Sequence, residues 1–487
     1  MRPSRYFAIV TQQDDGHDLL RGMQEAPQQV FSSLQEAPAT PYGKSQMRPP
    51  HLRLAVGVAL LIVSLMIGLY VVWRPMHFVM LVVLLAASFP LLFSIIRPRA
   101  KNLMNVNYPL QSAHSTDLGR YTVLFPIFHE ANMMPQIRAQ VSQLNYPGDK
   151  LEVLILMEAA DHATQSAAMA QTWPDYCRLV VVPEGQPRTK ARACNYGLEM
   201  STGTYLVIYD AEDKPHPDQL LHASLAFARS AEDVACLQAP LRIQASGQGW
   251  LQHQFCLEYR ILFLLTLPVL SYLDAVVPLG GSSNHFRASY LRAVGGWDDY
   301  NLTEDAELSM RLAKHHYTTK LIRSTTVENA PLSLRVFMNQ RTRWLTGHIQ
   351  TLHQHMASPL ATLGLLGWRR CILANIILMS RLVIGITHTI YLLSTIYFTL
   401  PILTGDNPFG AEHAAPITVL AGYLIFSTMY FLIGLIYLSR MPMPYRIFIA
   451  LTQTFYWAIT SVALVRALKR VLAGQLNWLK TPHRPFD

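Results

Sequence analysis

Three acidic residues follow a short apolar run in the stretch LVIYDAEDKP at residues 206–215. Asp210, Glu212 and Asp213 place three negative charges within four positions, and like charges this close repel one another. Carboxylate oxygens are the ligands that Mg²⁺ and Mn²⁺ prefer, and such a cation can in turn bind a diphosphate. The pattern therefore predicts a divalent-cation site at Asp210 and Glu212, with Asp213 as a competing second ligand. A solvated acidic turn is the alternative for these residues taken alone.

A second acidic group, Thr303-Glu304-Asp305, stands at the start of a predicted helix. Threonine is a good N-cap residue, and acidic side chains in a first turn interact favourably with the helix dipole, so a structural role would suffice. The functional interpretation makes Asp305 a general base that takes the proton of an attacking hydroxyl.

The stretch NQRTRWLTG at residues 339–347 contains Gln340, Arg343 and Trp344. An arginine can bind a diphosphate in a bidentate manner, and a neighbouring tryptophan can stack on a sugar ring. The same residue types also occur in helix packing and at membrane interfaces. On its own this segment leaves both interpretations open.

Short apolar runs precede the first of these motifs and alternate with helix-like stretches. The runs occupy residues 121–128, 151–157, 177–183 and 204–210, and the helix-like stretches occupy residues 132–144 and 189–200. Continuous apolar strands separated by helices are typical of a parallel sheet that is covered on both faces. Because ligands bind beyond the carboxyl ends of such strands, Asp210 stands where a site is expected.

Apolar stretches of membrane-spanning length flank this α/β region. Residues 54–73 and 76–96 are each long enough for a helix to cross a bilayer, which predicts a transmembrane hairpin over residues 53–97. Arg97, Arg99 and Lys101 follow it directly, and such basic clusters favour the cytoplasmic side. We therefore expect a disordered cytoplasmic tail at residues 1–52 and a cytosolic domain at residues 110–350.

The membrane-like pattern returns after the α/β region. Residues 351–381 mix arginines with apolar residues and are expected to form interfacial helices. Residues 382–466 hold two or three spans, since 382–403 and 417–439 fit a bilayer and 447–465 is ambiguous. Residues 467–487 form a basic tail, which argues for a cytoplasmic end.

Composition agrees with a chain partly dissolved in lipid. Of its 487 residues, 51% are hydrophobic and 15% are charged, with a net charge of +9. The basic residues gather at the ends of apolar runs, which argues against nucleic-acid binding. The five cysteines include no CxxC pair, so neither a disulfide framework nor a zinc site is expected.

Taken in chain order, the motifs resemble those of the membrane-integrated, processive glycosyltransferases of family 2, which include cellulose synthase and hyaluronan synthase. The resemblance covers residue 50 to the end and depends on four motifs: the strand-end acid Asp161 in LILMEAADHAT, Asp-Ala-Glu at 210–212, Thr-Glu-Asp at 303–305, and Gln-x-x-Arg-Trp at 340–344. The second motif departs from the family, which has aspartate where Glu212 stands. The resemblance implies a glycosyltransferase-A-type α/β domain, with a mostly parallel nucleotide-binding sheet, inserted between transmembrane helices.

The resemblance also implies roles for individual residues. The catalytic pair would be Asp305 and Glu304, and Mg²⁺ or Mn²⁺ would be held by Asp210 and Glu212. The nucleotide and donor would be bound by Glu130, Asp161, Lys190, Asn195 and Asp210. The acceptor end and the diphosphate would be bound by Gln340, Arg343 and Trp344, and the tail would supply the gating residues Trp478, Lys480 and Thr481.

The function implied is inverting transfer of a sugar from a nucleotide-sugar, with UDP-glucose favoured, to a growing exopolysaccharide of the envelope or a biofilm matrix. Transfer would be coupled to movement of the polymer through a bacterial inner membrane, with periplasmic or regulatory subunits as further partners. Two alternatives stay open at this point: non-processive transfer of one sugar to a lipid carrier, and a catalytically inactive transporter component.

Overall fold

The computed structural model describes residues 118–247, 249–404, 432 and 441–475. The predicted N-terminal tail and hairpin, nearly all of the predicted span 417–439, and the gating residues Trp478, Lys480 and Thr481 lie outside the described residues.

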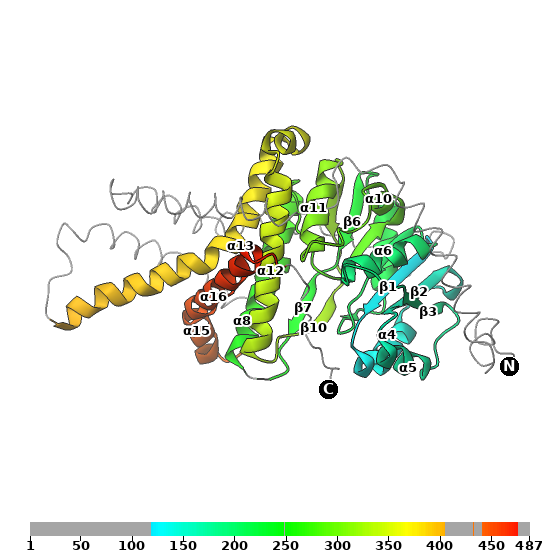
Figure 1. Cartoon of the computed structure of the whole chain (residues 1–487), viewed down its shortest axis with the longest axis horizontal. Coiled ribbons are helices and arrows are strands. Elements are labelled where there is room, and N and C mark those ends of the chain that lie inside the picture. Colours follow the sequence, from blue (N-terminus) through cyan, green and yellow to red (C-terminus); the bar gives the residue numbers. More distant parts are fainter. Residues whose placement is uncertain (1–117, 248, 405–431, 433–440, 476–487) are drawn as a thin grey trace.

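A seven-stranded sheet forms the centre of the α/β region, with strand order β3-β2-β1-β4-β8-β6-β9 (Figure 1). Its strands are β1 (Tyr121–Ile127), β2 (Leu151–Glu158), β3 (Cys177–Val182), β4 (Tyr205–Ile208), β6 (Val234–Gln238), β8 (Asn284–Arg287) and β9 (Thr318–Leu321). Neighbouring strands are parallel except at β8, which runs antiparallel to both β4 and β6. The predicted mostly parallel α/β sheet is confirmed, whereas the reversed strand β8 was not predicted.

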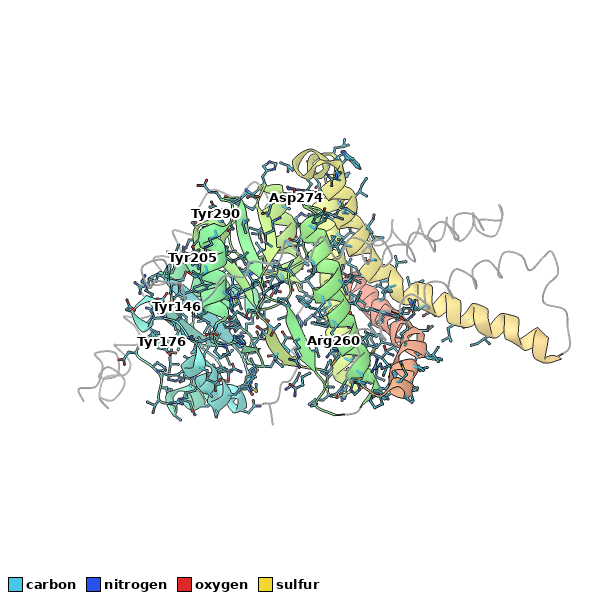
Figure 2. All side chains as sticks on the ribbon, turned by 180° about the vertical axis from the view of Figure 1, so that it is seen from behind. Tyr146, Tyr176, Tyr205, Arg260, Asp274 and Tyr290 are labelled. Atoms are coloured by element: carbon cyan, nitrogen blue, oxygen red, sulfur yellow. The ribbon has the colours of Figure 1, made fainter. Side chains whose placement is uncertain are left out.

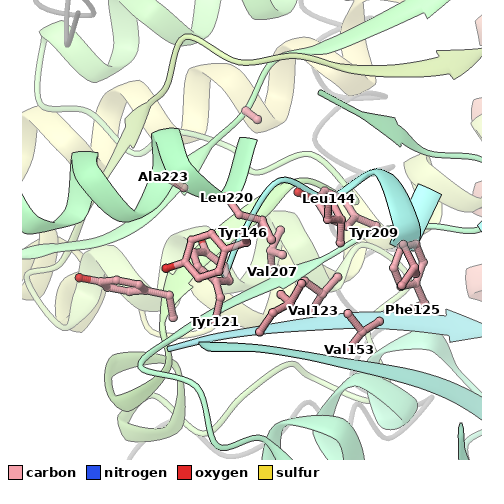
Figure 3. Close-up of a cluster of buried hydrophobic side chains, with 14 of the residues drawn as sticks. Tyr121, Val123, Phe125, Leu144, Tyr146, Val153, Val207, Tyr209, Leu220 and Ala223 are labelled. Carbon is pink, nitrogen blue, oxygen red and sulfur yellow. The ribbon is translucent and has the colours of Figure 1, made fainter. Parts of the chain in front are cut away.

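Helices bury both faces of this sheet, which explains why its strands are apolar at consecutive positions. On one face Tyr121, Val123 and Phe125 of β1 pack with side chains from the helical layer, including Leu220 and Ala223 (Figure 3). The helices of that layer are α4 (Met134–Gln143), α5 (His162–Met169) and α7 (Gln219–Arg229). The opposite face is covered by α6 (Lys190–Met200), α10 (Ala288–Ala293) and α11 (Glu304–Lys314).

A second, three-stranded sheet has the order β5-β10-β7 and consists of β5 (Lys214–Pro215), β10 (Thr326–Asn329) and β7 (Leu241–Gln244). β5 begins directly after the acidic motif, and β10 pairs with it in antiparallel register, Val327 opposite Lys214. This pairing brings Glu328 beside the acidic motif although the two are more than a hundred residues apart in the chain.

Helices from the second half of the chain pack beside this small sheet (Figure 1). They are α8 (Trp250–Ile261), the π-helical turn η5 (Leu262–Thr266), α9 (Leu267–Tyr272), α12 (Leu334–Met356), α13 (Pro359–Thr404), α15 (Met443–Leu451) and α16 (Gln453–Leu472). α13 has a kink at Gly367, where φ is 72°, and then continues as a helix that projects away from the sheet. Arg370, just after the kink, donates from Nε to the Asp274 carbonyl at 2.9 Å, and Asp274 lies beside α13 in Figure 2.

Two described helical segments, Trp250–Tyr272 and Met443–Leu472, are long and apolar enough to cross a membrane by length and composition. About half of the most apolar window of each is buried against protein, as is also usual for core helices. The second segment contains the ambiguous stretch 447–465 and is interrupted at Thr452, between α15 and α16. The predicted span 382–403 lies within α13. The predicted domain limits at residues 350 and 381 fall inside α12 and α13, and that division of the chain stays a prediction.

Gly347 brings α12 unusually close to the start of α11. A Cβ atom added at Gly347 would lie 2.5 Å from the backbone nitrogen of Thr303, a distance that real side chains do not reach. We therefore expect Gly347→Ala to force the two helices apart and to destabilise the chain by about 1–3 kcal/mol, the usual cost of overpacking. A melting curve of the purified protein measures this. Gly364→Ala, at a helical position with nothing near the added atom, is the control and should leave the melting temperature unchanged or slightly higher; equal melting of both variants would contradict the close contact.

Candidate active site

A cavity of about 380 Å³ lies beyond the carboxyl ends of β1 and β4 and extends toward α8, α12 and α13. The strand order reverses direction between β1 and β4, and open α/β sheets bind ligands at such a point. Nine of the residues that the sequence predicts for the site line this one cavity: Glu130, Lys190, Asp210, Glu212, Glu304, Asp305, Gln340, Arg343 and Trp344.

The acidic motif turns two of its three carboxylates toward the cavity. Asp210 and Glu212 line it, whereas Asp213 is completely buried and accepts a hydrogen bond from the backbone N–H of Asp210 at 2.8 Å. Asp213 therefore closes the turn that follows β4. This geometry favours Glu212 over Asp213 as the second acid available to a ligand.

Lys190, the first residue of α6, reaches into the same region. Its Nζ forms an ion pair with Asp210 and donates to the carbonyl oxygen of Gly281 at 2.6 Å. Burial alone would lower the pKa of Lys190, but the neighbouring Asp210 carboxylate raises it well above its usual value. Thr189 precedes it as an N-cap whose hydroxyl accepts from the N–H of Arg192 at 3.3 Å, so the helix start is well defined.

Glu328 of β10 is a site residue that sequence reasoning missed. It lines the cavity and accepts a hydrogen bond from the Ser282 hydroxyl at 3.2 Å. Burial and the charges of Glu212 and Asp210 raise the pKa of Glu328 to about 7. The only sequence signal was an acid within the strand-like stretch TTVEN, and its neighbours are decided by strand pairing rather than by local pattern.

We expect Glu328→Gln to stabilise the chain at pH 8 when no divalent cation is present. The folded-state pKa of Glu328 is about 7, against 4.5 for the free group, so its favourable contribution is complete below pH 4.5 and is lost as the pH rises through 7. The glutamine variant escapes this loss and should be more stable by about 1–2 kcal/mol at pH 8, with little difference near pH 4.5. Melting curves in EDTA at both pH values measure the effect. Glu199→Gln, at an exposed acid outside the cavity, should show no such pH dependence.

Asp305 and Glu304 occupy the first turn of α11 at the cavity wall. Burial raises the pKa of Asp305, although the N–H of Ala306 donates to its Oδ1 at 2.8 Å. Burial and the adjacent Asp305 charge raise the pKa of Glu304 to about 7. A raised pKa makes Asp305 a stronger base, which suits proton abstraction from a hydroxyl.

Thr303 stands at the N-cap position of α11, as its residue type favours, but its side chain makes no capping hydrogen bond. Its hydroxyl instead donates to Asn301 Oδ1 at 3.3 Å, and the tight approach of Gly347 on α12 leaves the threonine side chain against that helix. Tertiary packing outweighs the local capping preference here.

Gln340, Arg343 and Trp344 lie on the face of α12 that lines the cavity. Gln340 Oε1 and Arg343 Nε are buried and have no hydrogen-bond partner among the described residues, which is unusual because an unsatisfied buried polar atom costs free energy. The positive charge of Arg343 also lowers the pKa values of Glu304 and Asp305 against the effect of burial. The polar atoms on this face of α12 are therefore available to hydrogen-bond a polar ligand beside Glu304 and Asp305.

Arg341 also lines the cavity, although it was not predicted as a site residue. Its Nη1 donates to Glu258 Oε1 of α8 at 2.8 Å, and its Nη2 donates to the Tyr456 hydroxyl of α16 at 2.8 Å. Arg381 of α13 donates to the same Glu258 Oε1 at 3.3 Å. The guanidinium carbon of Arg341 also lies 4.9 Å from the ring centre of Trp344. The cluster Glu258–Arg341–Arg381–Tyr456 thus joins four helices at the wall of the cavity, which Glu258, Arg341 and Arg381 line.

Two predicted donor-binding residues do not line the cavity. Asp161 is 2% exposed and accepts hydrogen bonds from the N–H groups of His129 and Thr164, which fixes the loop that carries Glu130. Asn195 donates to the Trp297 carbonyl at 2.8 Å and accepts from the Trp297 N–H at 2.8 Å, which fixes the loop before α11. In this structure both act on loops that border the cavity, and their contact with a donor stays a prediction.

The cavity's acidic side chains suit a hard divalent cation. Asp210 and Glu212 offer carboxylate oxygens, and burial together with the charges of Glu212 and Asp210 raises the pKa of the neighbouring Glu328. Among the described residues no three side chains of the usual ligand types already surround a single point. Two carboxylates are enough for Mg²⁺ or Mn²⁺, which usually keep water or substrate phosphate in their other positions.

Comparison with known proteins agrees with the family resemblance that the motifs indicate. Residues 205–409 match the family model described as glycosyl transferase family group 2. The probable glycosyltransferase YdaM of Bacillus subtilis is 24% identical over 245 residues, 50% of this chain and 58% of that protein. Glucomannan 4-beta-mannosyltransferase 2 of Arabidopsis thaliana is 26% identical over 235 residues, 46% of this chain and 43% of that protein. The chain thus spans about half the length of the curated relatives it matches.

Among solved structures, the mannosyltransferase PcManGT of Pyrobaculum calidifontis, in complex with GDP-Man and Mn²⁺, is similar with a TM-score of 0.45 and 21% identity over 72% of this chain and 98% of that one. The segment that matches the family model contains the acidic motif, the Thr-Glu-Asp motif and the Gln-x-x-Arg-Trp motif. The predicted donor-binding residues Glu130, Asp161, Lys190 and Asn195 precede it. Residues 205–409 of the chain therefore match glycosyl transferase family group 2, and the relatives named above are glycosyltransferases.

Proposed function

We propose that the chain is an inverting β-glycosyltransferase of the processive kind, transferring sugar from a nucleotide-sugar to a growing exopolysaccharide. One observation carries the proposal: the acids Asp210 and Glu212, the base candidate Asp305 and the cavity-facing residues of α12 line one continuous cavity. The relatives named above include a synthase of a β-linked glucomannan, which supports a polysaccharide product. UDP-glucose is the favoured donor.

Each group has a distinct task in this mechanism. When bound at Asp210 and Glu212, Mg²⁺ or Mn²⁺ supplies Lewis-acid stabilisation of the departing diphosphate. Asp305 accepts the proton of the acceptor hydroxyl as that oxygen forms its bond to the anomeric carbon and the bond from that carbon to the diphosphate breaks. One such displacement inverts the configuration, so an α-linked donor gives a β-linked product. Glu304 completes the catalytic pair beside Asp305, whose charge raises the pKa of Glu304. Gln340, Arg343 and Trp344 hold the acceptor end and the diphosphate.

The proposed setting is a bacterial inner membrane with the catalytic domain in the cytoplasm and several spans, the polymer leaving through the helices. The two apolar helical segments support membrane association. Periplasmic or regulatory subunits, and the closing of the tail residues Trp478, Lys480 and Thr481 over the donor, belong to this proposal as well.

The test is incubation of membranes that contain the protein with a panel of radiolabelled nucleotide-sugars, followed by sizing of the product. A polymer that grows from one donor, UDP-glucose first, is the expected result. A single sugar on an extractable lipid would instead establish the non-processive alternative. Absence of transfer from every donor, with the purified chain folded, would favour an inactive transporter component.

We expect chelation to abolish transfer. Without a cation, the charge that develops on the leaving diphosphate faces the carboxylates of Asp210 and Glu212, and the single charge of Lys190 does not offset them. Activity should fall below detection after exhaustive EDTA treatment and return on addition of Mg²⁺ or Mn²⁺, measured by incorporation of labelled sugar. Ca²⁺ added in the same amount serves as a comparison for the size and geometry of the ion. Full activity after chelation would remove the cation from the mechanism.

A further inference from the structure

Lys190 already supplies a positive charge at the position where the proposed cation would bind. Its ammonium contacts Asp210 Oδ1 and, at 2.6 Å, the carbonyl oxygen of Gly281. The side chain is largely buried, with 16% of it exposed, so water does little to weaken this contact. Glu304 is the next acid whose charge acts on this ammonium.

A divalent cation on Asp210 and the Lys190 ammonium are direct competitors. Both are cations that would share one carboxylate, and at contact distances like charges repel strongly in a site of low dielectric constant. A cation that binds alone must therefore either displace Lys190 from Asp210 or accept its repulsion. Either route weakens binding of the cation by itself.

A diphosphate removes this conflict. It brings two or more negative charges, and its oxygens can accept hydrogen bonds from the Lys190 ammonium when the cation binds the Asp210 carboxylate. The Gly281 carbonyl belongs to a loop, residues 280–283, that is held from its other side by Gln238, whose Oε1 accepts from the N–H of Gly280 at 2.8 Å. Because this anchor does not involve Lys190, the ammonium can exchange partners while the loop stays in place.

We propose that Lys190 is a resident counter-ion of Asp210 that makes cation binding and nucleotide diphosphate binding depend on each other. The inference rests on the proposed function, since it assumes a cation and a nucleotide donor at this site. Linkage requires the effect to be reciprocal: the nucleotide tightens cation binding by the same factor by which the cation tightens nucleotide binding. Lys190 is thus a positioning residue that acts through its charge on Asp210. In the absence of a donor, its ammonium weakens binding of a cation at the acidic site.

The experiment measures Mn²⁺ binding to the purified full-length chain by electron paramagnetic resonance, with and without UDP or GDP and without any turnover. Working at pH 8 keeps the carboxylates ionised after the lysine charge is removed. In the wild-type chain the nucleotide should tighten Mn²⁺ binding about tenfold or more, within the usual range of coupling between sites. In Lys190→Met, Mn²⁺ alone should bind about tenfold more tightly than in the wild type, and the effect of the nucleotide should largely disappear.

Two further variants make the result specific. Lys190→Arg keeps the charge and should retain the coupling, which separates the counter-ion role from loss of folding. Lys214→Met removes one positive charge from an exposed position four residues beyond Asp210 and outside the cavity lining, and it should behave like the wild type. If Lys214→Met tightened Mn²⁺ binding as much as Lys190→Met, a general charge effect would replace the proposed one.

The outcomes also distinguish this inference from the proposed function. Unchanged or weaker binding of Mn²⁺ alone to Lys190→Met, with nucleotide still bound, would overturn the counter-ion role and leave the glycosyltransferase mechanism intact. Failure of both UDP and GDP to bind the wild-type chain in the presence of Mn²⁺ would overturn the nucleotide-sugar mechanism and this inference together.

Discussion

Asp305→Asn is expected to reduce the rate of sugar transfer about 10²–10⁴-fold, the usual contribution of a general base. The amide has the same shape as the carboxyl group and can still accept the hydrogen bond from the N–H of Ala306, so the fold should be kept. It cannot accept the proton of the attacking hydroxyl. Membrane vesicles with a labelled donor measure the rate, and binding of the nucleotide to the purified variant should be nearly unchanged because the acids that would hold the cation are untouched.

The control for this variant is Asp233→Asn, which makes the same chemical change at an exposed position outside the cavity. It should transfer sugar at the wild-type rate. Near wild-type transfer by Asp305→Asn would exclude Asp305 as the base, and Glu304, the adjacent acid with a pKa of about 7, would then be the next residue to substitute.

Glu258→Ala is expected to give the largest loss of stability, about 3–5 kcal/mol, because removal of one partner leaves buried charges without compensation. Glu258 is 5% exposed and is the acid shared by Arg341 and Arg381. Its loss would leave two guanidinium groups facing each other among packed helices. The melting temperature of the purified chain in detergent measures the effect.

A double substitution tests whether the loss comes from the unpaired charge. Glu258→Met combined with Arg341→Met replaces the buried pair by apolar side chains, a change that is often neutral in other proteins. We expect the double variant to melt well above Glu258→Ala, with Arg381 reaching solvent through its partly exposed side chain. Equal destabilisation of both variants would mean that packing, rather than charge, is what Glu258 contributes.

Sequence reasoning succeeded where local pattern and structure coincide. The strands β1, β2, β3 and β4 were predicted within a few residues, because each consists mostly of apolar residues. β1, β2 and β4 are buried along nearly their whole length, whereas β3, at the edge of the sheet, is only partly buried. Asp210 was placed at a site because ligands bind beyond the carboxyl ends of parallel strands, and the family resemblance added the Thr-Glu-Asp motif to that site. In the structure the two motifs line one cavity, and their roles in catalysis stay a prediction.

Residues whose roles depend on distant partners were out of reach. Glu328 enters the site only because β10 pairs with β5, and Glu258 and Arg341 matter only because α8 and α12 lie against each other. Asp161 was predicted to bind the donor, but in the structure it caps α5. An acid at the end of a strand has the same sequence pattern whether it caps a helix or binds a ligand. Neither distinction is present in composition, periodicity or spacing.

The shared carboxylate at Glu258 has an evolutionary consequence. Four helices, α8, α12, α13 and α16, each contribute one residue to this charged cluster. Substitution of any one of these residues therefore changes the charge and hydrogen bonding of the other three. Homologous sequences should therefore vary at these positions as a set, keeping all four residues or replacing the acid and its arginines together. Lineages that lost only one of them would be expected to be rare and to carry a compensating charge nearby.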